Sequence, residues 1–249
     1  MTLQTGEVYM QDSLVLTLHP ELSYEFYEVG REKTPLLVID KFIKDAHLLV
    51  DFCAANTNFT KVDNFYPGLR MDAPARYIHS INYYLAELLS NIFGLTQDKI
   101  AGGKALYSMV VTPPEQLEIT QCLPHIDSYL SGDLACVHYL CGREKGGTSL
   151  YRHKKTGYEK ITTETIDHYK ESVVNEGALK LEKKSYMNGS NDYFEQIANV
   201  ESVFNRMVIY PSNILHSGNI SADFNFDPHP TQGRLTLNSF IYSKRDPII

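Results

Sequence analysis

ALYSMVVT (residues 105–112) opens a series of apolar runs that decides the fold class of this chain; the others are DLACVHYLCG (133–142), GTSLYRH (147–153), NRMVIYP (205–211) and RLTLNSFIY (234–242). Each run is short, contains β-branched and aromatic residues, and is bounded by residues that favour turns, as β-strands are. Several short strands at this spacing indicate a sandwich or a jelly roll. We therefore predict a mainly β protein with helices outside the strands.

The sequence before these runs predicts short strands and two helices. PLLVIDKF (35–42) is an apolar run typical of a buried strand, and the apolar residues from Leu48 to Cys53 then recur at helical spacing. A second helix is expected between Asp72, which can cap it, and Gly94, which can end it. Its apolar stripe consists of Ile78, Ile81, Leu85, Leu88 and Ile92.

The chain length fits one domain. It has 249 residues, of which 43% are hydrophobic, and this is enough for one well-buried core. We predict a single domain over residues 1–249, with supporting strands and helices in 1–100 and the β core in 101–249. An insertion near 162–200, rich in polar and aromatic residues, interrupts the strand series; such insertions are lids or plain surface excursions.

Composition excludes several classes of partner. The net charge is -7, with both signs mixed along the chain, so no basic stripe is available for nucleic acid. No apolar run approaches the roughly 18 residues that span a bilayer, and residues 1–20 lack a basic segment followed by an apolar one. We expect a soluble, cytoplasmic protein without a membrane partner. The cysteines show no C-x-x-C spacing, so free thiols are expected.

His125-Ile126-Asp127 is a candidate for metal binding. A non-haem iron site that activates oxygen uses two imidazoles and one carboxylate, which leaves other positions open. In an extended segment, side chains two residues apart point to the same side, so His125 and Asp127 could reach one ion. With 9 histidines and 30 acidic residues, an H-x-[DE] motif should arise roughly once by chance. His19-Pro20-Glu21 is such a match, and its proline would be awkward inside a paired strand.

The order of the following motifs favours the pair at residue 125. The segment 146–151 (GGTSLY) reads as a turn into a strand, and FNRMVIYPSNILHSG (204–218) reads as a strand, a turn and then His216. Arg234 opens the last apolar run. Each feature is weak when taken singly, but together they supply a second imidazole and an arginine after the first pair.

Through these motifs the sequence resembles the 2-oxoglutarate/Fe(II) dioxygenase superfamily, in particular bacterial members related to the prolyl 4-hydroxylases. The resemblance covers residues 104–242, through PHID, YLCGREKGGTSLY, VIYPSNILHSG and RLTLNSF, and residues 1–100 resemble an uncharacterised bacterial group within the superfamily. It implies a double-stranded β-helix (jelly-roll, cupin-like) core, Fe(II) held by His125, Asp127 and His216, and 2-oxoglutarate held by Arg234. It also implies use of O₂, with hydroxylation of an unactivated C–H bond in a small-molecule, amino-acid or peptide substrate.

Other residues are candidates for the cosubstrate. A planar guanidinium pairs bidentately with a carboxylate, which favours an arginine such as Arg234. Thr236 shares a strand face with Arg234 and could donate to the same carboxylate, although threonine is also simply a good strand residue. Tyr139 could reach the cosubstrate or could be a core tyrosine. Because the interval from His216 to Arg234 is long, Arg143 or Arg152 could take the place of Arg234.

The segment NFYPGLR (64–70) is a candidate for substrate binding through Tyr66 and Arg70. It is aromatic, turn-forming and basic, and we expect a loop between the two predicted helices. An arginine beside an aromatic ring suits a substrate that carries a carboxylate, whereas the alternative is a surface turn with a solvated Arg70.

The remaining histidines lack partners at useful spacing. His138, inside an apolar run, is expected in the core or behind a metal ligand, and His153 is expected in a solvated, charged hairpin. Two rival functions remain: a cupin-like metal- or sugar-binding barrel without oxygen chemistry, and a barrel that serves only as an interaction module. An inward-facing arginine opposite the metal would favour the oxygenase.

Overall fold

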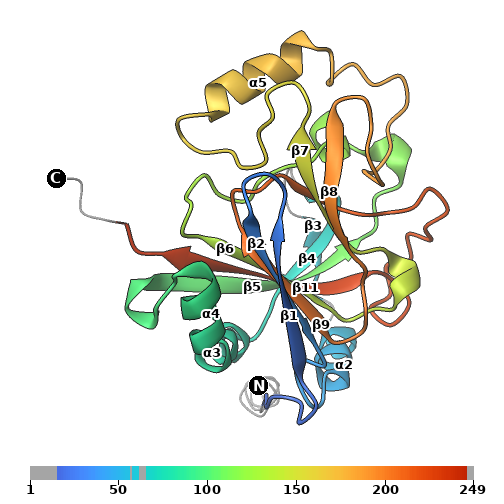
Figure 1. The fold of residues 1–249 in the computed structure, drawn as a ribbon. Coiled ribbons are helices and arrows are strands. Elements are labelled where there is room, and N and C mark those ends of the chain that lie inside the picture. The colour runs from blue at the N-terminus through green and yellow to red at the C-terminus, as the bar shows by residue number, and fades with distance from the viewer. Residues whose placement is uncertain (1–15, 57, 62–65, 246–249) are drawn as a thin grey trace, which may run out of the picture.

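Two antiparallel β-sheets form the core of the protein (Figure 1). The computed structural model describes residues 16–56, 58–61 and 66–245. The larger sheet contains, in spatial order, β1 (Ser23–Val29), β2 (Thr34–Asp40), β9 (Arg206–Pro211), β6 (Leu134–Tyr139), β11 (Leu235–Ser243), β5 (Ile100–Val110), β4 (Gly68–Asp72) and β3 (Thr60–Lys61). The smaller sheet contains β10 (His216–Gly218), β7 (Thr148–His153) and β8 (Phe194–Val200). The predicted mainly β, jelly-roll fold with flanking helices is confirmed. The prediction for residues 1–20 falls mostly on residues 1–15, outside the described part of the chain.

Alternating side chains divide the larger sheet into two apolar faces. In β6, Leu134 and Cys136 join one core cluster, and Ala135, Val137 and Tyr139 join another. The first cluster includes side chains from the helices, and the second includes Leu150, Val200 and Ile214 from in and around the smaller sheet. This is the two-residue period of a strand that is covered on both sides.

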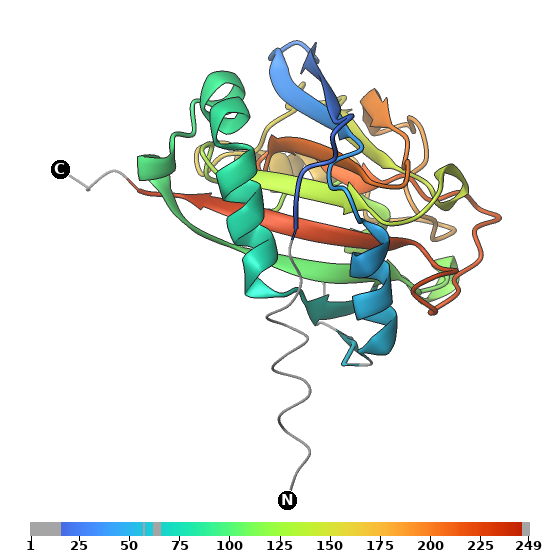
Figure 2. The same cartoon turned by 90° about the horizontal axis from the view of Figure 1, so that it is seen from below.

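The helices α2 (His47–Ala55), α3 (Ala75–Tyr84) and α4 (Ala86–Phe93) cover one face of the larger sheet (Figure 2). The single helix predicted from Asp72 to Gly94 is wrong in two respects. Asp72 is the last residue of β4, and Pro74 occupies the N-cap of α3. The helical run also breaks at Leu85, although Gly94 ends α4 in the left-handed conformation as expected.

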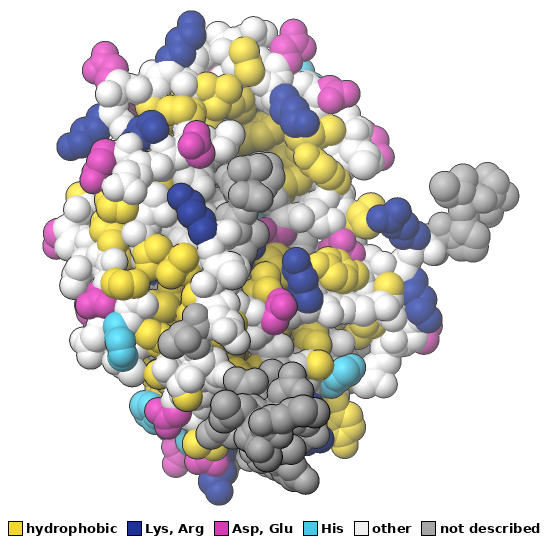
Figure 3. Space-filling view, turned by 180° about the vertical axis from the view of Figure 1, so that it is seen from behind, with side chains coloured by type: hydrophobic (Ala, Val, Ile, Leu, Met, Phe, Trp, Pro, Cys, Tyr) yellow, Lys and Arg dark blue, Asp and Glu magenta, His cyan; other side chains and the backbone are white. Residues whose placement is uncertain are grey.

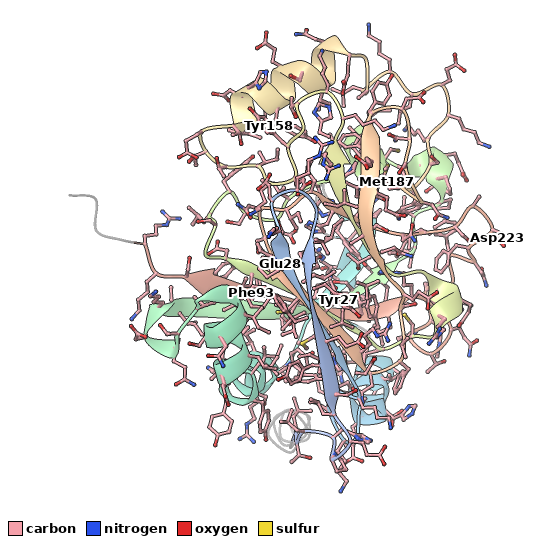
Figure 4. The ribbon with its side chains drawn as sticks, viewed as in Figure 1. Tyr27, Glu28, Phe93, Tyr158, Met187 and Asp223 are labelled. Atoms are coloured by element: carbon pink, nitrogen blue, oxygen red, sulfur yellow. The ribbon has the colours of Figure 1, made fainter. Side chains whose placement is uncertain are left out.

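The stretch 162–200, predicted as an insertion, contains α5 (Ile166–Asn175) but also ends in β8, a paired strand of the smaller sheet. Val173 of α5 packs with Met187 and Phe194 on the side of the smaller sheet that faces away from the larger one. Figure 4 shows Tyr158 beside α5 and Met187 beside β8. The prediction failed for β8 because FEQIANV pairs on one side only and is largely half-exposed, so it lacks a clear apolar period.

His153 is not solvated, contrary to prediction. It is fully buried and hydrogen-bonded to Thr156 and, at 2.6 Å, to Glu176 just beyond α5. Its neighbour Arg152 is also buried and pairs with Glu159. The end of β7 is therefore joined by buried polar contacts to the segment that contains α5.

On the surface, acidic and basic side chains are interspersed over the face that Figure 3 displays. Within the described ranges, no helix has the length and apolar character that crossing a membrane requires. Short 3-10 turns occur at Gln97–Lys99, Pro114–Gln116, Ile119–Cys122 and Arg143–Lys145.

Candidate metal centre

A short backbone ladder joins the two segments that carry the predicted ligands. His125 and His216 form an antiparallel bridge, with N–H···O distances of 2.9 Å in both directions. The N–H of Asp127 donates to the Ser212 carbonyl at 2.8 Å, in the turn between β9 and β10. Segments almost a hundred residues apart are thereby fixed side by side, and their side chains project to the same place.

The structure brings His125, Asp127 and His216 together. One ligand atom from each lies within 4.8 Å of the others. An Asp127 carboxylate oxygen lies 3.2 Å from His216 Nε2, and the other lies 3.8 Å from His125 Nε2. Two imidazoles and one carboxylate in this arrangement could hold a divalent transition metal and leave further coordination positions open.

The orientation of His216 suits metal binding. Its Nδ1 lies 2.9 Å from the Ile214 carbonyl, so Nδ1 carries the proton and donates. The lone pair of Nε2 then points toward Asp127. A backbone carbonyl that fixes the tautomer in this way is a common feature behind ligating histidines. The Tyr210 ring lies against His216, with centroids 4.9 Å apart.

Electrostatics favour charged Asp127 and neutral His125. Desolvation of the ring among surrounding protein atoms lowers the pKa of His125 to about 4 even though part of the side chain is exposed, and His216 acts in the same direction. For Asp127, burial raises the pKa, but His216, His125 and Arg70 outweigh it, so the pKa lies below its ordinary value. For His216, burial lowers the pKa, but Asp127 outweighs this and the pKa is raised. A metal would therefore compete with a proton mainly at His216.

The three ligands differ in exposure. The His125 side chain is 48% exposed and that of Asp127 19%, whereas that of His216 is 6% exposed. The centre is therefore open on the side of His125 and closed on the side of His216. A ligand from solvent could therefore approach a metal held by these three residues past His125.

Strand register aligns further candidates across the larger sheet. Arg70 of β4 pairs with Ser108 of β5, Ser108 pairs with Thr236 of β11, and Thr236 pairs with Tyr139 of β6. Directly opposed residues share a face of a sheet, so these side chains form one row. Tyr139 belongs to the cluster that faces the smaller sheet, so the row lies between the two sheets.

Arg234 precedes Thr236 by two residues, so it lies beside this row on the same face of the sheet, and it is 4% exposed. Its Nε donates to the Gly146 carbonyl at 3.2 Å, and its Nη2 donates to the Gly147 carbonyl at 2.9 Å. A Cβ on Gly147 would lie 1.8 Å from the Val200 carbonyl oxygen, so only glycine lets β7 and β8 approach this closely. These bonds fix the guanidinium and leave other N–H groups free to bind a carboxylate.

The other predicted cosubstrate residues already have partners. The Tyr139 hydroxyl donates to Thr148 at 2.7 Å, and the Thr236 hydroxyl donates to the Ser108 carbonyl at 3.4 Å. The Arg234 guanidinium carbon lies 5.8 Å from the Tyr139 ring centroid. Tyr139 and Thr236 thus form the wall beside Arg234.

The alternative arginines are engaged elsewhere. Arg143 is exposed and pairs with Glu201 at 2.9 Å. Arg152 bonds to Glu159 through Nε at 2.7 Å and to Glu195 through Nη1 at 2.6 Å. Arg143 therefore lies at the surface, and the buried Arg152 is held between two carboxylates, so neither occupies a position like that of Arg234.

The predicted loop at 64–70 is wrong for Arg70, whereas Tyr66 lies in a bend before the strand and residues 64 and 65 lie outside the described part of the chain. Gly68–Asp72 is strand β4 of the larger sheet, so Arg70 belongs to a packed element. Its guanidinium carbon lies 4.2 Å from the Tyr66 ring centroid. The Tyr66 hydroxyl is buried and makes no hydrogen bond of good geometry to any described residue, although the Ser108 hydroxyl and Arg234 lie nearby.

Two residues near the candidate cosubstrate site, Asn238 and Tyr186, were not predicted from the sequence. Asn238 lies two residues after Thr236 on β11, and its buried Oδ1 has no hydrogen-bond partner in the described ranges. The sequence did contain a signal for Asn238, because residues spaced by two in a strand share a face, and Asn238 continues the series Arg234, Thr236. Tyr186, from the 162–200 stretch, packs with Tyr66, Phe224 and Phe226. No local sequence pattern indicates that Tyr186 contacts these aromatic residues, because they are distant in sequence and come together only in the folded protein.

Two solved structures resemble the fold of this chain at low sequence identity. The non-heme alpha ketoglutarate dependent epimerase SnoN from nogalamycin biosynthesis is 10% identical, with a TM-score of 0.40 over 80% of this chain and 71% of that chain. HygX from Streptomyces hygroscopicus, with nickel and 2-oxoglutarate bound, is 12% identical, with a TM-score of 0.43 over 84% of this chain and 83% of that chain.

Among curated proteins, none matches this chain. One family model does match, over residues 20–241, which is most of the sequence. The chain therefore belongs to the family described as a family of unknown function, DUF6445.

Proposed function

We propose that the protein is an Fe(II)- and 2-oxoglutarate-dependent oxygenase that hydroxylates an unactivated C–H bond. The observation that carries the proposal is an open group of two histidines and one aspartate between the same sheets as a buried arginine with free N–H groups. A barrel that only binds metal or sugar has no need for Arg234 in that position. The motif order along the chain supports a relation to prolyl 4-hydroxylase-like members of the superfamily.

In this proposal His125, Asp127 and His216 hold Fe(II), and Arg234 holds the far carboxylate of 2-oxoglutarate. Thr236 and Tyr139 line the wall beside that carboxylate. When bound, iron and 2-oxoglutarate would activate O₂: one oxygen atom would enter succinate as 2-oxoglutarate loses CO₂, and the other would enter the substrate C–H bond as a hydroxyl group.

In this proposal the protein holds the metal ligands and the Arg234 guanidinium in fixed orientations and keeps water away from the cosubstrate. The Ile214 carbonyl keeps the His216 proton on Nδ1, and the carbonyls of Gly146 and Gly147 hold the Arg234 guanidinium. Apolar side chains, including Phe224, Phe226 and Tyr186, pack around Tyr66 near Arg234 and exclude water there. The small-molecule, amino-acid or peptide substrate would enter on the open side of His125.

A succinate assay tests the proposal. Purified protein supplied with Fe(II), 2-oxoglutarate and O₂ should form succinate, and His216→Ala should form none. Metal binding at the three residues without any turnover or binding of 2-oxoglutarate would instead support the metal- or sugar-binding barrel.

A further inference from the structure

Arg70 is a second arginine between the sheets, and it forms no ion pair or hydrogen bond with an acidic side chain of residues 16–56, 58–61 and 66–245, although the charge of Asp127 acts on it from a longer distance. Its Nε is buried without a hydrogen-bond partner, and its guanidinium rests on the Tyr66 ring at 4.2 Å. A buried N–H group without a hydrogen-bond partner is costly, and the Asp127 carboxylate is assigned to the metal. Such a group is poised for a ligand that brings a negative charge.

The position of Arg70 differs from that of Arg234. Arg70 lies close enough to Asp127 for the two charges to interact, and it is itself partly exposed. Arg234 is 4% exposed and is tied to the start of β7. Arg70 therefore belongs to the open, metal-proximal part of the site, and Arg234 belongs to the closed end.

We propose that Arg70 binds a carboxylate of the substrate, so that the substrate is an organic acid that enters past His125. This rests on the proposed function, because it assigns the carboxylate of 2-oxoglutarate to Arg234. The Tyr66 ring positions the guanidinium through a cation–π contact, and the N–H groups that the ring does not cover are free to pair with a carboxylate. The carboxylate beside the keto group of 2-oxoglutarate offers the same chemistry, and the titration of 2-oxoglutarate alone described below separates that case.

The test uses benzoate and its uncharged isostere benzamide as probes. Full-length protein is loaded with Mn(II) and saturated with N-oxalylglycine, an analogue of 2-oxoglutarate, and each probe is titrated by calorimetry. Wild type, Arg70→Gln, Arg70→Lys and Arg234→Gln are compared. In a second titration each Mn(II)-loaded protein receives 2-oxoglutarate alone.

Wild type should bind benzoate at least about fivefold more tightly than benzamide, since a charge-assisted pair adds more than about 1 kcal/mol. Arg70→Gln should lose this preference, Arg70→Lys should keep part of it, and Arg234→Gln should retain it in full at saturating N-oxalylglycine. Arg234→Gln should instead weaken 2-oxoglutarate by tenfold or more.

Equal binding of benzoate and benzamide by wild type would overturn the proposal, as would a preference that persists in Arg70→Gln. Loss of 2-oxoglutarate binding in Arg70→Gln, with benzoate binding unaffected, would assign Arg70 to the cosubstrate and also overturn it. Normal 2-oxoglutarate binding by Arg234→Gln would contradict the proposed function instead, which keeps the two failures distinguishable.

Discussion

At the scale of single residues, the use of His216 as a metal ligand depends on the position of its ring proton, which must lie on Nδ1 so that Nε2 is free. The Ile214 carbonyl fixes the His216 tautomer, and the two Asp127 carboxylate oxygens face the Nε2 atoms of His125 and His216. Removing a partner that only orients a ligand typically costs 10–100-fold in metal affinity, and removing a ligand should cost more.

His125→Ala, Asp127→Ala and His216→Ala should therefore each lower Fe(II) affinity by more than about 100-fold, because each removes one of three ligands. Metal content after anaerobic reconstitution checks this, with circular dichroism to verify the fold. His79→Ala, an exposed histidine on α3, is the matched control and should bind normally. Full iron content in His216→Ala would refute the ligand assignment.

The Arg234→Ala variant should bind iron normally but should need a much higher 2-oxoglutarate concentration for turnover. Truncating one partner of a desolvated charge pair costs about 2–5 kcal/mol, which is more than tenfold in affinity. Arg143→Ala removes an exposed arginine of the same charge and should leave 2-oxoglutarate binding unchanged. The reverse pattern would mean that a different arginine holds the cosubstrate.

At the scale of elements, strand register aligns the groups between the sheets. β4, β5, β11 and β6 place Arg70, Ser108, Thr236 and Tyr139 in one row, and the close approach of β7 to β8 supplies the carbonyls that hold Arg234. The site therefore depends on backbone spacing at Gly147.

Gly147→Ala should lower both stability and 2-oxoglutarate affinity. Its methyl group would lie 1.8 Å from the Val200 carbonyl oxygen, which must move, and overpacking of this kind costs about 1–3 kcal/mol. Gly102→Ala is the control, because its methyl group would meet no atom within 4 Å. Urea unfolding and calorimetric titration measure the two effects. If the two variants behave alike, the glycine does not position Arg234.

The buried strands were predictable from sequence, and the edge elements were not. The runs that became β5, β6, β7, β9 and β11 are apolar because neighbours cover them. β1, SYEFYEV, is almost wholly exposed at the edge of the larger sheet, and β8 pairs on one side only, so neither shows a clear apolar period.

At the scale of the whole molecule, the sequence predicted the candidate metal and cosubstrate residues better than it predicted the residues that surround them. The three metal residues and Arg234 appear in motifs whose order along the chain carries information. Asn238, Tyr186 and the strand position of Arg70 depend on which segments pair across the sheet, and residue spacing along the chain does not specify that pairing.

The buried core also predicts how stability varies with pH. Burial lowers the pKa of His138 to about 4, against an ordinary value of 6.5, although its hydrogen bond to Asn205 acts in the opposite direction. The folded state therefore binds fewer protons than the unfolded state between these values, and stability falls as pH falls. The loss from His138 should be about 2 kcal/mol between about pH 7 and pH 5.

Urea unfolding of wild type and His138→Gln at both pH values checks this, with both proteins metal-free so that His125, whose pKa is also lowered, contributes equally. The variant should lose less stability on acidification than wild type. Equal losses would mean that His138 can be protonated in the folded protein.

A crystal structure with Mn(II) and N-oxalylglycine is the most direct test of the proposed oxygenase site. We expect Mn(II) bound by His125 Nε2, Asp127 and His216 Nε2, with the inhibitor chelating the metal and its far carboxylate on Arg234. Mn(II) bound elsewhere, or a far carboxylate that avoids Arg234, would contradict the proposal.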